Sequence, residues 1–103
     1  VSIQYLDKGY YAAYETNSKY EVIDKEGQVV INDYFMAEGQ IFEFDGVVYG
    51  ILNKSGTTYL YNMDDQESVF SLEGKYVLYQ DMYLMKKNHK AYYDLEGNVI
   101  YKE

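Results

Sequence analysis

Several residue types are missing from the sequence, and each absence excludes a class of protein. The 103 residues include no arginine, cysteine, proline or tryptophan, and only one histidine. Without cysteine the chain can form neither a disulfide scaffold nor a cysteine-ligated zinc site. Nine lysines against 17 aspartates and glutamates give a formal net charge of −8, so no basic stripe is available for a phosphate backbone. We therefore predict no nucleic-acid partner, no metal site and no cofactor.

Long apolar runs are missing as well, because no stretch approaches the roughly 18 consecutive apolar residues of a membrane-spanning helix. We therefore predict no membrane insertion. Apolar residues nevertheless make up 48% of the chain, and 15 tyrosines account for most of its aromatic content, so the composition is that of a folded domain. The chain begins at Val1 rather than at methionine, which suggests a processed form or a piece of a larger protein.

The hydrophobic pattern of the chain has a period of two almost everywhere, and no window shows helical spacing. This pattern predicts short β-strands rich in Tyr, Val, Ile, Phe and Thr. Between them, only Asn32–Gln40 and Asn62–Glu67 are long enough for a helical turn or an irregular crossover. The expected strands are Ile3–Leu6, Tyr10–Glu15, Tyr20–Ile23, Gln28–Asn32, Gln40–Phe44, Val47–Leu52, Thr57–Asn62, Ser68–Ser71, Lys75–Gln80, Met82–Lys86, Lys90–Tyr93 and Asn98–Lys102.

A four-residue turn with glycine at its end recurs along the chain. Asp, Asn or Ser at the first position can bond the backbone two residues on, and glycine at the fourth takes the left-handed conformation that closes a hairpin. The four copies are Asp24-Lys-Glu-Gly27, Asn53-Lys-Ser-Gly56, Ser71-Leu-Glu-Gly74 and Asp94-Leu-Glu-Gly97. The cross-strand pairs that we expect are Ile23 with Val29, Leu52 with Thr58, Phe70 with Tyr76, and Tyr93 with Val99. Two further hairpins are expected at Asp7-Lys8-Gly9 and at Asp45-Gly46.

These turns predict an imperfect repeat of hairpins of about 20 residues each. A lone hairpin is marginally stable, so the hairpins must join into common sheets to bury their apolar faces. The fold class that follows is all-β: an antiparallel meander of repeated β-hairpins, about ten strands in all, forming a rolled sheet, sandwich or barrel-like body in a single domain over residues 1–103. A closed propeller, with at least four blades of about 40 residues, is excluded unless copies of the chain associate.

Two segments resemble the bacterial WG repeat, in which an aromatic-Gly dipeptide precedes an Ile-Asp-Lys-x-Gly hairpin. They are Tyr20–Ile31 and Tyr49–Leu60, and Tyr49-Gly50 lies where that family has Trp-Gly. Glu21 replaces the glycine in the first copy, and the usual tryptophan is absent. Ala91–Ile100 also resembles the aromatic hairpins of Gram-positive cell-wall-binding repeats. The WG resemblance implies a non-catalytic β-repeat module in a bacterial protein, with an extracytoplasmic location favoured over the cytoplasm.

Candidate catalytic and metal-binding groups are few. His89, the only histidine, lies in a basic turn with no identifiable orienting carboxylate or nucleophile, so we expect a solvent-exposed turn residue. The acidic segment Asn62–Glu67 could supply oxygens to Ca²⁺, but Glu67 stands where a calcium loop requires glycine, and no helices flank it. Carboxylate pairs such as Glu43 and Asp45 have no spacing that fixes a glycosidase cleft. We therefore predict that the protein is not an enzyme.

Tyrosine is the feature with two interpretations. Adjacent strand residues point to opposite faces, so the phenol rings must occupy both faces of the sheet. They can pack in the core with their hydroxyls reaching water or a backbone partner, or form an exposed strip that binds a sugar or a protein. The candidate binding residues are Tyr59, Tyr61, Tyr76, Tyr79 and Tyr83.

Three functions are compatible with this sequence. The leading hypothesis is a non-catalytic β-repeat module for protein–protein interaction or structural support in a bacterial surface or secreted protein, because aromatic faces supply contact area and acidic surfaces supply charge complementarity. The first alternative is carbohydrate or cell-wall binding through exposed tyrosines. The second is a small acidic immunity or inhibitor protein that imitates the charge of nucleic acid.

Overall fold

The computed structural model describes residues 2–16 and 19–103, and in this part of the chain every regular element is a β-strand. All neighbouring strands pair antiparallel. The strands are β1 (Ser2–Asp7), β2 (Tyr10–Thr16), β3 (Lys19–Asp24), β4 (Val29–Phe44), β5 (Val47–Lys54), β6 (Thr57–Asn62), β7 (Glu67–Glu73), β8 (Tyr76–Tyr79), β9 (Tyr83–Lys86), β10 (Ala91–Tyr93) and β11 (Val99–Lys102). The predicted all-β hairpin meander is therefore confirmed.

Strand β4 is 16 residues long and belongs to two sheets. Its first half pairs with β3, as far as Met36 opposite Lys19, and its second half pairs with β5, where Met36 also lies opposite Asn53 and regular pairing starts at Gln40 opposite Ile51. Hydrogen bonding therefore runs without a break from β1 to β7, while β8 to β11 form a separate group. The result is three four-stranded sheets. We call them the N-terminal sheet (β1–β3 and residues 29–36), the middle sheet (residues 40–44 and β5–β7) and the C-terminal sheet (β8–β11).

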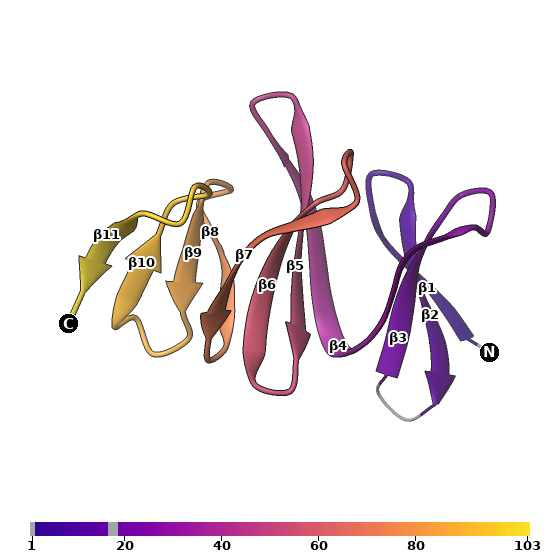
Figure 1. The fold of residues 1–103 in the computed structure, drawn as a ribbon, viewed down its shortest axis with the longest axis horizontal. Helices are drawn as coiled ribbons and strands as arrows, with labels where there is room; N and C mark the ends of the chain where they lie inside the picture. Colours follow the sequence, from indigo (N-terminus) through magenta and orange to yellow (C-terminus); the bar gives the residue numbers. More distant parts are fainter. Residues whose placement is uncertain (1, 17–18) are drawn as a thin grey trace.

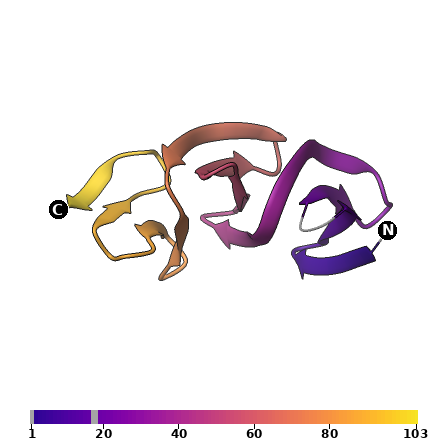
Figure 2. The ribbon, with the colours of Figure 1, turned by 90° about the horizontal axis from the view of Figure 1, so that it is seen from below.

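The three sheets lie side by side in a row instead of closing into a barrel (Figure 1). Seen from below, β4 runs from one side of the row to the other, and the segment that follows β7 crosses in the same way (Figure 2). The chain thus leaves each sheet at one edge and enters the next sheet at the opposite edge. The molecule measures 41 × 31 × 19 Å along its principal axes, so the row is elongated and flat.

Two hydrophobic cores hold the row together. The first joins the N-terminal sheet, through Ala12, Val22 and Ile31, to the middle sheet, through Leu52 and other side chains. The second joins the opposite face of the middle sheet to Leu84 and its neighbours in the C-terminal sheet. Burial of such an aliphatic side chain stabilises the fold by about 1.5–3 kcal/mol. Because both of its faces are covered, the middle sheet buries consecutive residues such as Ile51 and Leu52.

Close packing in the first core explains one glycine. A Cβ at Gly50 would lie 3.0 Å from Met63 Sδ and 3.1 Å from Ile41 Cδ1. The dipeptide Tyr49-Gly50 therefore places a ring toward the second core and leaves room in the first for Met63, which is almost fully buried.

The hairpin predictions are confirmed at several turns. Ile23 pairs with Val29, and Tyr93 pairs with Val99. Phe44 pairs with Val47 across Asp45 and Gly46, whose φ angles of 52° and 81° are those of a type I′ turn. The predicted pairing of Leu52 with Thr58 is wrong by one residue. Leu52 faces Tyr59 instead, because the turn is a two-residue loop at Ser55 and Gly56.

The predicted hairpin at Ser71-Leu-Glu-Gly74 is wrong, because β7 and β8 belong to different sheets and Phe70 does not pair with Tyr76. The segment is instead anchored to the β5–β6 hairpin. Gly74 N–H donates to the carbonyl of Gly56 (2.8 Å). The buried hydroxyl of Thr58 donates to the carbonyl of Gly74 (2.7 Å) and accepts from Tyr76 N–H (3.0 Å). These bonds satisfy the backbone where the chain crosses between sheets.

The repeating unit is the four-stranded sheet and not the single hairpin. Asp24, Asn62 and Asp94 each begin the turn between the third and fourth strands of their sheets, and each side chain accepts two backbone N–H groups of its own turn. Residues 32–40, the expected crossover, continue as strand within β4. Nowhere in the described residues is there a helix long and apolar enough to cross a membrane.

Candidate functional site: the open sheet faces

The structure separates the five candidate tyrosines. Tyr61 and Tyr76 are core side chains, 9% and 7% exposed, in the first and second cores respectively. Tyr59 packs against the first core, with its ring 6.3 Å from that of Tyr61. Burial also raises the pKa of Tyr76, with a further contribution from Tyr93. Only Tyr79 and Tyr83 lie beyond the two cores, both in the C-terminal sheet.

Tyr79 belongs to a surface that we call the C-terminal face, the side of the C-terminal sheet turned away from the second core. Leu78 and Leu84 pair across β8 and β9 and point into that core, so the alternate residues point outward. The outward residues of the strands, none of them charged, are Val77, Tyr79, Tyr83, Met85, Tyr92 and Tyr101. The ring of Tyr92 lies 5.3 Å from that of Tyr79 and 6.2 Å from that of Tyr101. The three rings thus form one aromatic cluster.

His89 lies beside this cluster. It occupies an exposed turn, as predicted, with a φ of 64°, and its Nδ1 is 3.3 Å from the hydroxyl of Tyr92. Its backbone N–H donates to the carbonyl of Lys86 (2.7 Å), which closes the turn between β9 and β10.

A second apolar surface lies at the other end of the row. We call it the N-terminal face, the side of the N-terminal sheet turned away from the first core. Ala12 and Val22 point into that core, so their strand neighbours point outward. The outward residues are Ile3, Tyr5, Tyr11, Ala13, Ile23 and Val29, with the charged Lys19 and Glu21 among them. Ala13 and Ile23 are themselves buried, 8% and 9% exposed. Ile3 is 62% exposed and Tyr5 56%, and the Tyr5 and Tyr11 rings are 5.1 Å apart.

A cavity of about 460 Å³ opens at the seam between the middle and C-terminal sheets. Its walls combine the aromatic residues Phe44, Tyr49 and Tyr83 with the acidic residues Asp45, Asp94 and Glu96. Tyr83 also pairs with Tyr79, so it lies where the cavity meets the C-terminal face. Rings beside carboxylates are a composition that can bind a polar ligand such as a sugar.

The carboxylate of Asp94 is occupied by its own turn. It accepts backbone N–H groups from Glu96 (2.9 Å) and Asn98 (2.8 Å), and the Asn98 amide (3.1 Å). Burial acts to raise the pKa of Asp94, but these hydrogen bonds outweigh it, and the pKa lies below its usual value. Asp94 is therefore an ionised turn residue at neutral pH and has few acceptor positions left for a ligand.

A second cavity, also about 460 Å³, lies at the same seam and has a different lining. Lys86, Lys90 and Lys102 line it together with Glu73 and Glu103. The mixture of both charges leaves this cavity with little net potential.

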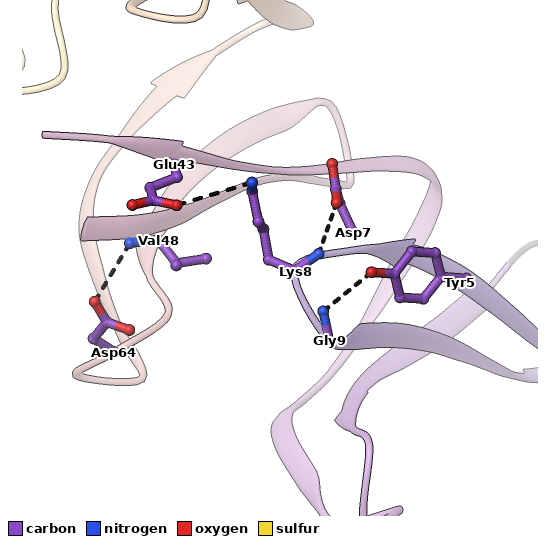
Figure 3. Close-up of polar contacts among 7 residues, drawn as sticks. All are labelled: Tyr5, Asp7, Lys8, Gly9, Glu43, Val48 and Asp64. Carbon is purple, nitrogen blue, oxygen red and sulfur yellow. Dashed lines mark hydrogen bonds and ion pairs between the residues drawn. The ribbon is translucent and has the colours of Figure 1, made fainter. Parts of the chain in front are cut away.

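In the acidic segment Asn62–Glu67, the side chains of Asn62 and Asp64 accept hydrogen bonds from the backbone. Asn62 Oδ1 accepts the N–H groups of Asp64 (3.0 Å) and Asp65 (3.1 Å). Asp64 Oδ2 accepts the N–H of Val48 (3.3 Å), as Figure 3 shows. In the same view, Lys8 Nζ lies 3.9 Å from Glu43 Oε1 and links the β1–β2 turn to β4. Both side chains of this ion pair are exposed, so the pair contributes little to stability.

Residues of the C-terminal face other than Tyr79 and Tyr83 were not among the candidates from the sequence. Met85 and Tyr92 could have been found from the alternation of β9 and β10, had the core positions Leu84 and Tyr93 been known, and Tyr101 of β11 follows from its pairing with Tyr92. Among the described residues, no group of three or more His, Asp or Glu side chains is placed to hold a metal ion.

Comparisons with protein-family models, with curated proteins and with solved structures give no match to this chain. The function must therefore be argued from the chain's own surfaces.

Proposed function

We propose that this protein is a non-catalytic β-repeat module that binds a folded protein through the open faces of its terminal sheets. The observation that carries the proposal is the C-terminal face, where Tyr79, Tyr92 and Tyr101 form a cluster with no charged side chain among them. Soluble proteins rarely leave a contiguous apolar surface uncovered unless it binds something.

The composition of this face suits a protein partner. Tyrosine gives a large, rigid contact area at a low cost in side-chain entropy and is enriched in binding surfaces. The net charge of −8 favours solubility of a module that exposes such apolar faces. The resemblance of Tyr20–Ile31 and Tyr49–Leu60 to WG repeats supports the same class of module.

Carbohydrate binding is a second candidate function, supported by the cavity that contains Tyr49, Tyr83 and Asp45. A sugar could stack on a ring there and bond a carboxylate. This site lies at the seam between two sheets, whereas the aromatic cluster lies on an open face, so separate substitutions can test the two functions.

The test uses immobilised wild-type chain and two variants, Tyr92→Lys on the C-terminal face and Tyr83→Ala at the cavity. Val69→Lys serves as a matched control, because Val69 is an exposed apolar residue on β7 outside both faces. Proteins retained from a bacterial extract by wild type and Val69→Lys, but not by Tyr92→Lys, are identified and titrated. We expect saturable binding that Tyr92→Lys weakens at least about tenfold.

Two results would contradict the proposal. Binding on a glycan array that is lost in Tyr83→Ala and insensitive to salt would favour the carbohydrate function. Binding to a basic protein that falls steeply with salt and is unchanged in Tyr92→Lys would favour a charge-mimicking inhibitor.

A further inference from the structure

We propose that the partner of the open faces is a second copy of this chain, bound head to tail, with the C-terminal face of one copy on the N-terminal face of the other. This inference rests on the proposed function, because it names the partner of the same surfaces. It follows from three features: the polarity of the row, the residue pattern of the terminal sheets, and the number of sheets.

The row has a direction. We call the face that a sheet turns toward the next sheet in chain order its forward face, and the face that it turns toward the preceding sheet its backward face. In the first core, the forward face of the N-terminal sheet packs on the backward face of the middle sheet. In the second core, the middle sheet presents its own forward face to the backward face of the C-terminal sheet. The C-terminal face is therefore a forward face without a following sheet, and the N-terminal face is a backward face without a preceding one. Joining them would repeat the contact that the chain already makes twice.

The residues of the two open faces match that contact in kind. At the second core, aromatic side chains of the middle sheet, Phe42, Tyr49 and Phe70, pack against a face that includes Leu84, Ala91 and Leu95. The C-terminal face is likewise aromatic, with Tyr79, Tyr92 and Tyr101. The N-terminal face offers the exposed aliphatic residues Ile3 and Val29 beside its two tyrosines.

The pattern along the terminal strands is that of sheets covered on both faces. Apolar and polar residues alternate along the strands of a sheet with one solvent-exposed face, whereas the strands of a sheet buried on both faces have continuous apolar runs. The middle sheet shows such runs at Ile51-Leu52 and Leu60-Tyr61, where both faces are covered. The terminal sheets show them too, at Tyr83-Leu84-Met85 in β9 and Tyr10–Tyr14 in β2. The outer faces of the terminal sheets therefore have the residue pattern of faces that another sheet covers.

The number of sheets favours a pair. Four-stranded sheets packed face to face in a ring are the architecture of propellers, which have about four to eight of them. The described residues form three such sheets, too few to close a ring, and two copies of this segment joined at both ends would supply six. Three chains would exceed the usual range. A closed pair covers all four terminal faces and leaves no open face to which further copies could add.

The experiment measures the mass of the purified chain in solution by sedimentation equilibrium over a range of concentrations. We expect a species of twice the chain mass of 12.1 kDa that dissociates on dilution. Ile3→Lys alters only the N-terminal face and Tyr101→Lys only the C-terminal face, and both residues are more than half exposed in the single chain. Each variant should be a monomer. An equimolar mixture of the two should regain a two-chain species, because it contains one intact pair of faces.

Val69→Lys, which alters neither face, should remain dimeric and controls for the added charge. Circular dichroism and a thermal melt of each variant establish that loss of the dimer is not loss of the fold. A dimer that survives Ile3→Lys would overturn the inference in favour of pairing between two C-terminal faces. A dimer that survives both substitutions would indicate pairing of strand edges and would also overturn it.

A wild-type chain that remains monomeric at the highest concentration overturns the second-copy inference alone if it still binds another protein through Tyr92. If it is monomeric and also retains no protein that Tyr92→Lys loses, the proposed function fails with it. The two failures are thus distinguishable.

Discussion

At the scale of single residues, side chains that accept backbone N–H groups stabilise three of the turns. Asp24, Asn62 and Asp94 each bond the backbone of the turn that follows them. A hydrogen bond to a carboxylate is stronger than one between neutral groups. Each of these residues therefore stabilises its own turn, and replacing one of them should lower the free energy of unfolding by a measurable amount.

Asp94→Ala should lower the free energy of unfolding by about 1–3 kcal/mol, because two backbone N–H groups lose a charged acceptor. Urea denaturation monitored by circular dichroism measures the difference. Glu96→Ala in the same turn is the matched control and should change stability by less than about 0.5 kcal/mol, since the Glu96 side chain is exposed. Equal effects of the two substitutions would contradict the role of the Asp94 carboxylate.

The same residue predicts a dependence on pH. Because the pKa of Asp94 is lower in the folded state than in the unfolded chain, its ionised form stabilises the fold at neutral pH. That contribution is complete above the unfolded pKa and declines as the pH falls toward the folded pKa. The stability difference between wild type and Asp94→Asn should therefore shrink as the pH is lowered below about 4. A difference that stays constant down to pH 2 would be inconsistent with this assignment.

At the scale of elements, the connection between β7 and β8 shows what the sequence alone could not provide. Ser71-Leu-Glu-Gly74 has the residues of a hairpin turn, yet its backbone bonds to the β5–β6 hairpin through Gly56 and Thr58. Local turn chemistry does not say which strand lies next to which. Phe70 faces Leu60 instead of Tyr76, because β6 already occupies one edge of β7 and Phe70 packs into the second core.

Thr58→Val tests this connection. The substitution keeps the shape of the side chain but removes the hydroxyl that serves Gly74 and Tyr76 in a buried place. The loss of stability should be about 2–3 kcal/mol, since a donor and an acceptor are left unsatisfied. Thr57→Val, at the adjacent, half-buried position, should cost less than about 1 kcal/mol and provides the comparison in thermal and urea unfolding.

Other elements are predicted well because their signals are local. Period-two alternation locates the strands of the described residues, except that it divides the long β4 into two strands with a crossover between them. Asp45-Gly46 defines its turn, since only a few residue types accept two successive positive φ angles. The candidate site is predicted less completely. Whether Tyr61 or Tyr92 is covered depends on which faces the neighbouring sheets cover, and that packing joins residues far apart in the chain.

At the scale of the whole molecule, each of the two cores joins one pair of adjacent sheets in the described residues, so we expect the stability to be a sum of contributions from the sheets and from the interfaces between them. Damage at one interface should therefore have its largest effect on one end of the row. The two separate cores allow this to be tested directly.

Leu84→Ala removes a fully buried side chain from the second core and should cost about 2–5 kcal/mol. Amide hydrogen exchange should rise most in β8 to β11 and least in β1 to β3, because the first core is intact. Val22→Ala in the first core is the matched variant and should show the reverse gradient. A uniform rise along the chain would show that the row unfolds as one cooperative unit.

The shared strand makes the two seams of the row mechanically unequal. Because β4 carries the hydrogen bonds of two sheets, the N-terminal and middle sheets cannot part unless that strand bends sharply or breaks its ladder. The C-terminal sheet shares no strand with the middle sheet: the chain joins the two through a short link at Gly74, and side-chain packing in the second core holds them together. A tensile load on the ends of the chain would be expected to peel off β8 to β11 first. A cut at that link would leave β1 to β7 in one piece and β8 to β11 in the other, each with its hydrogen-bond ladders intact.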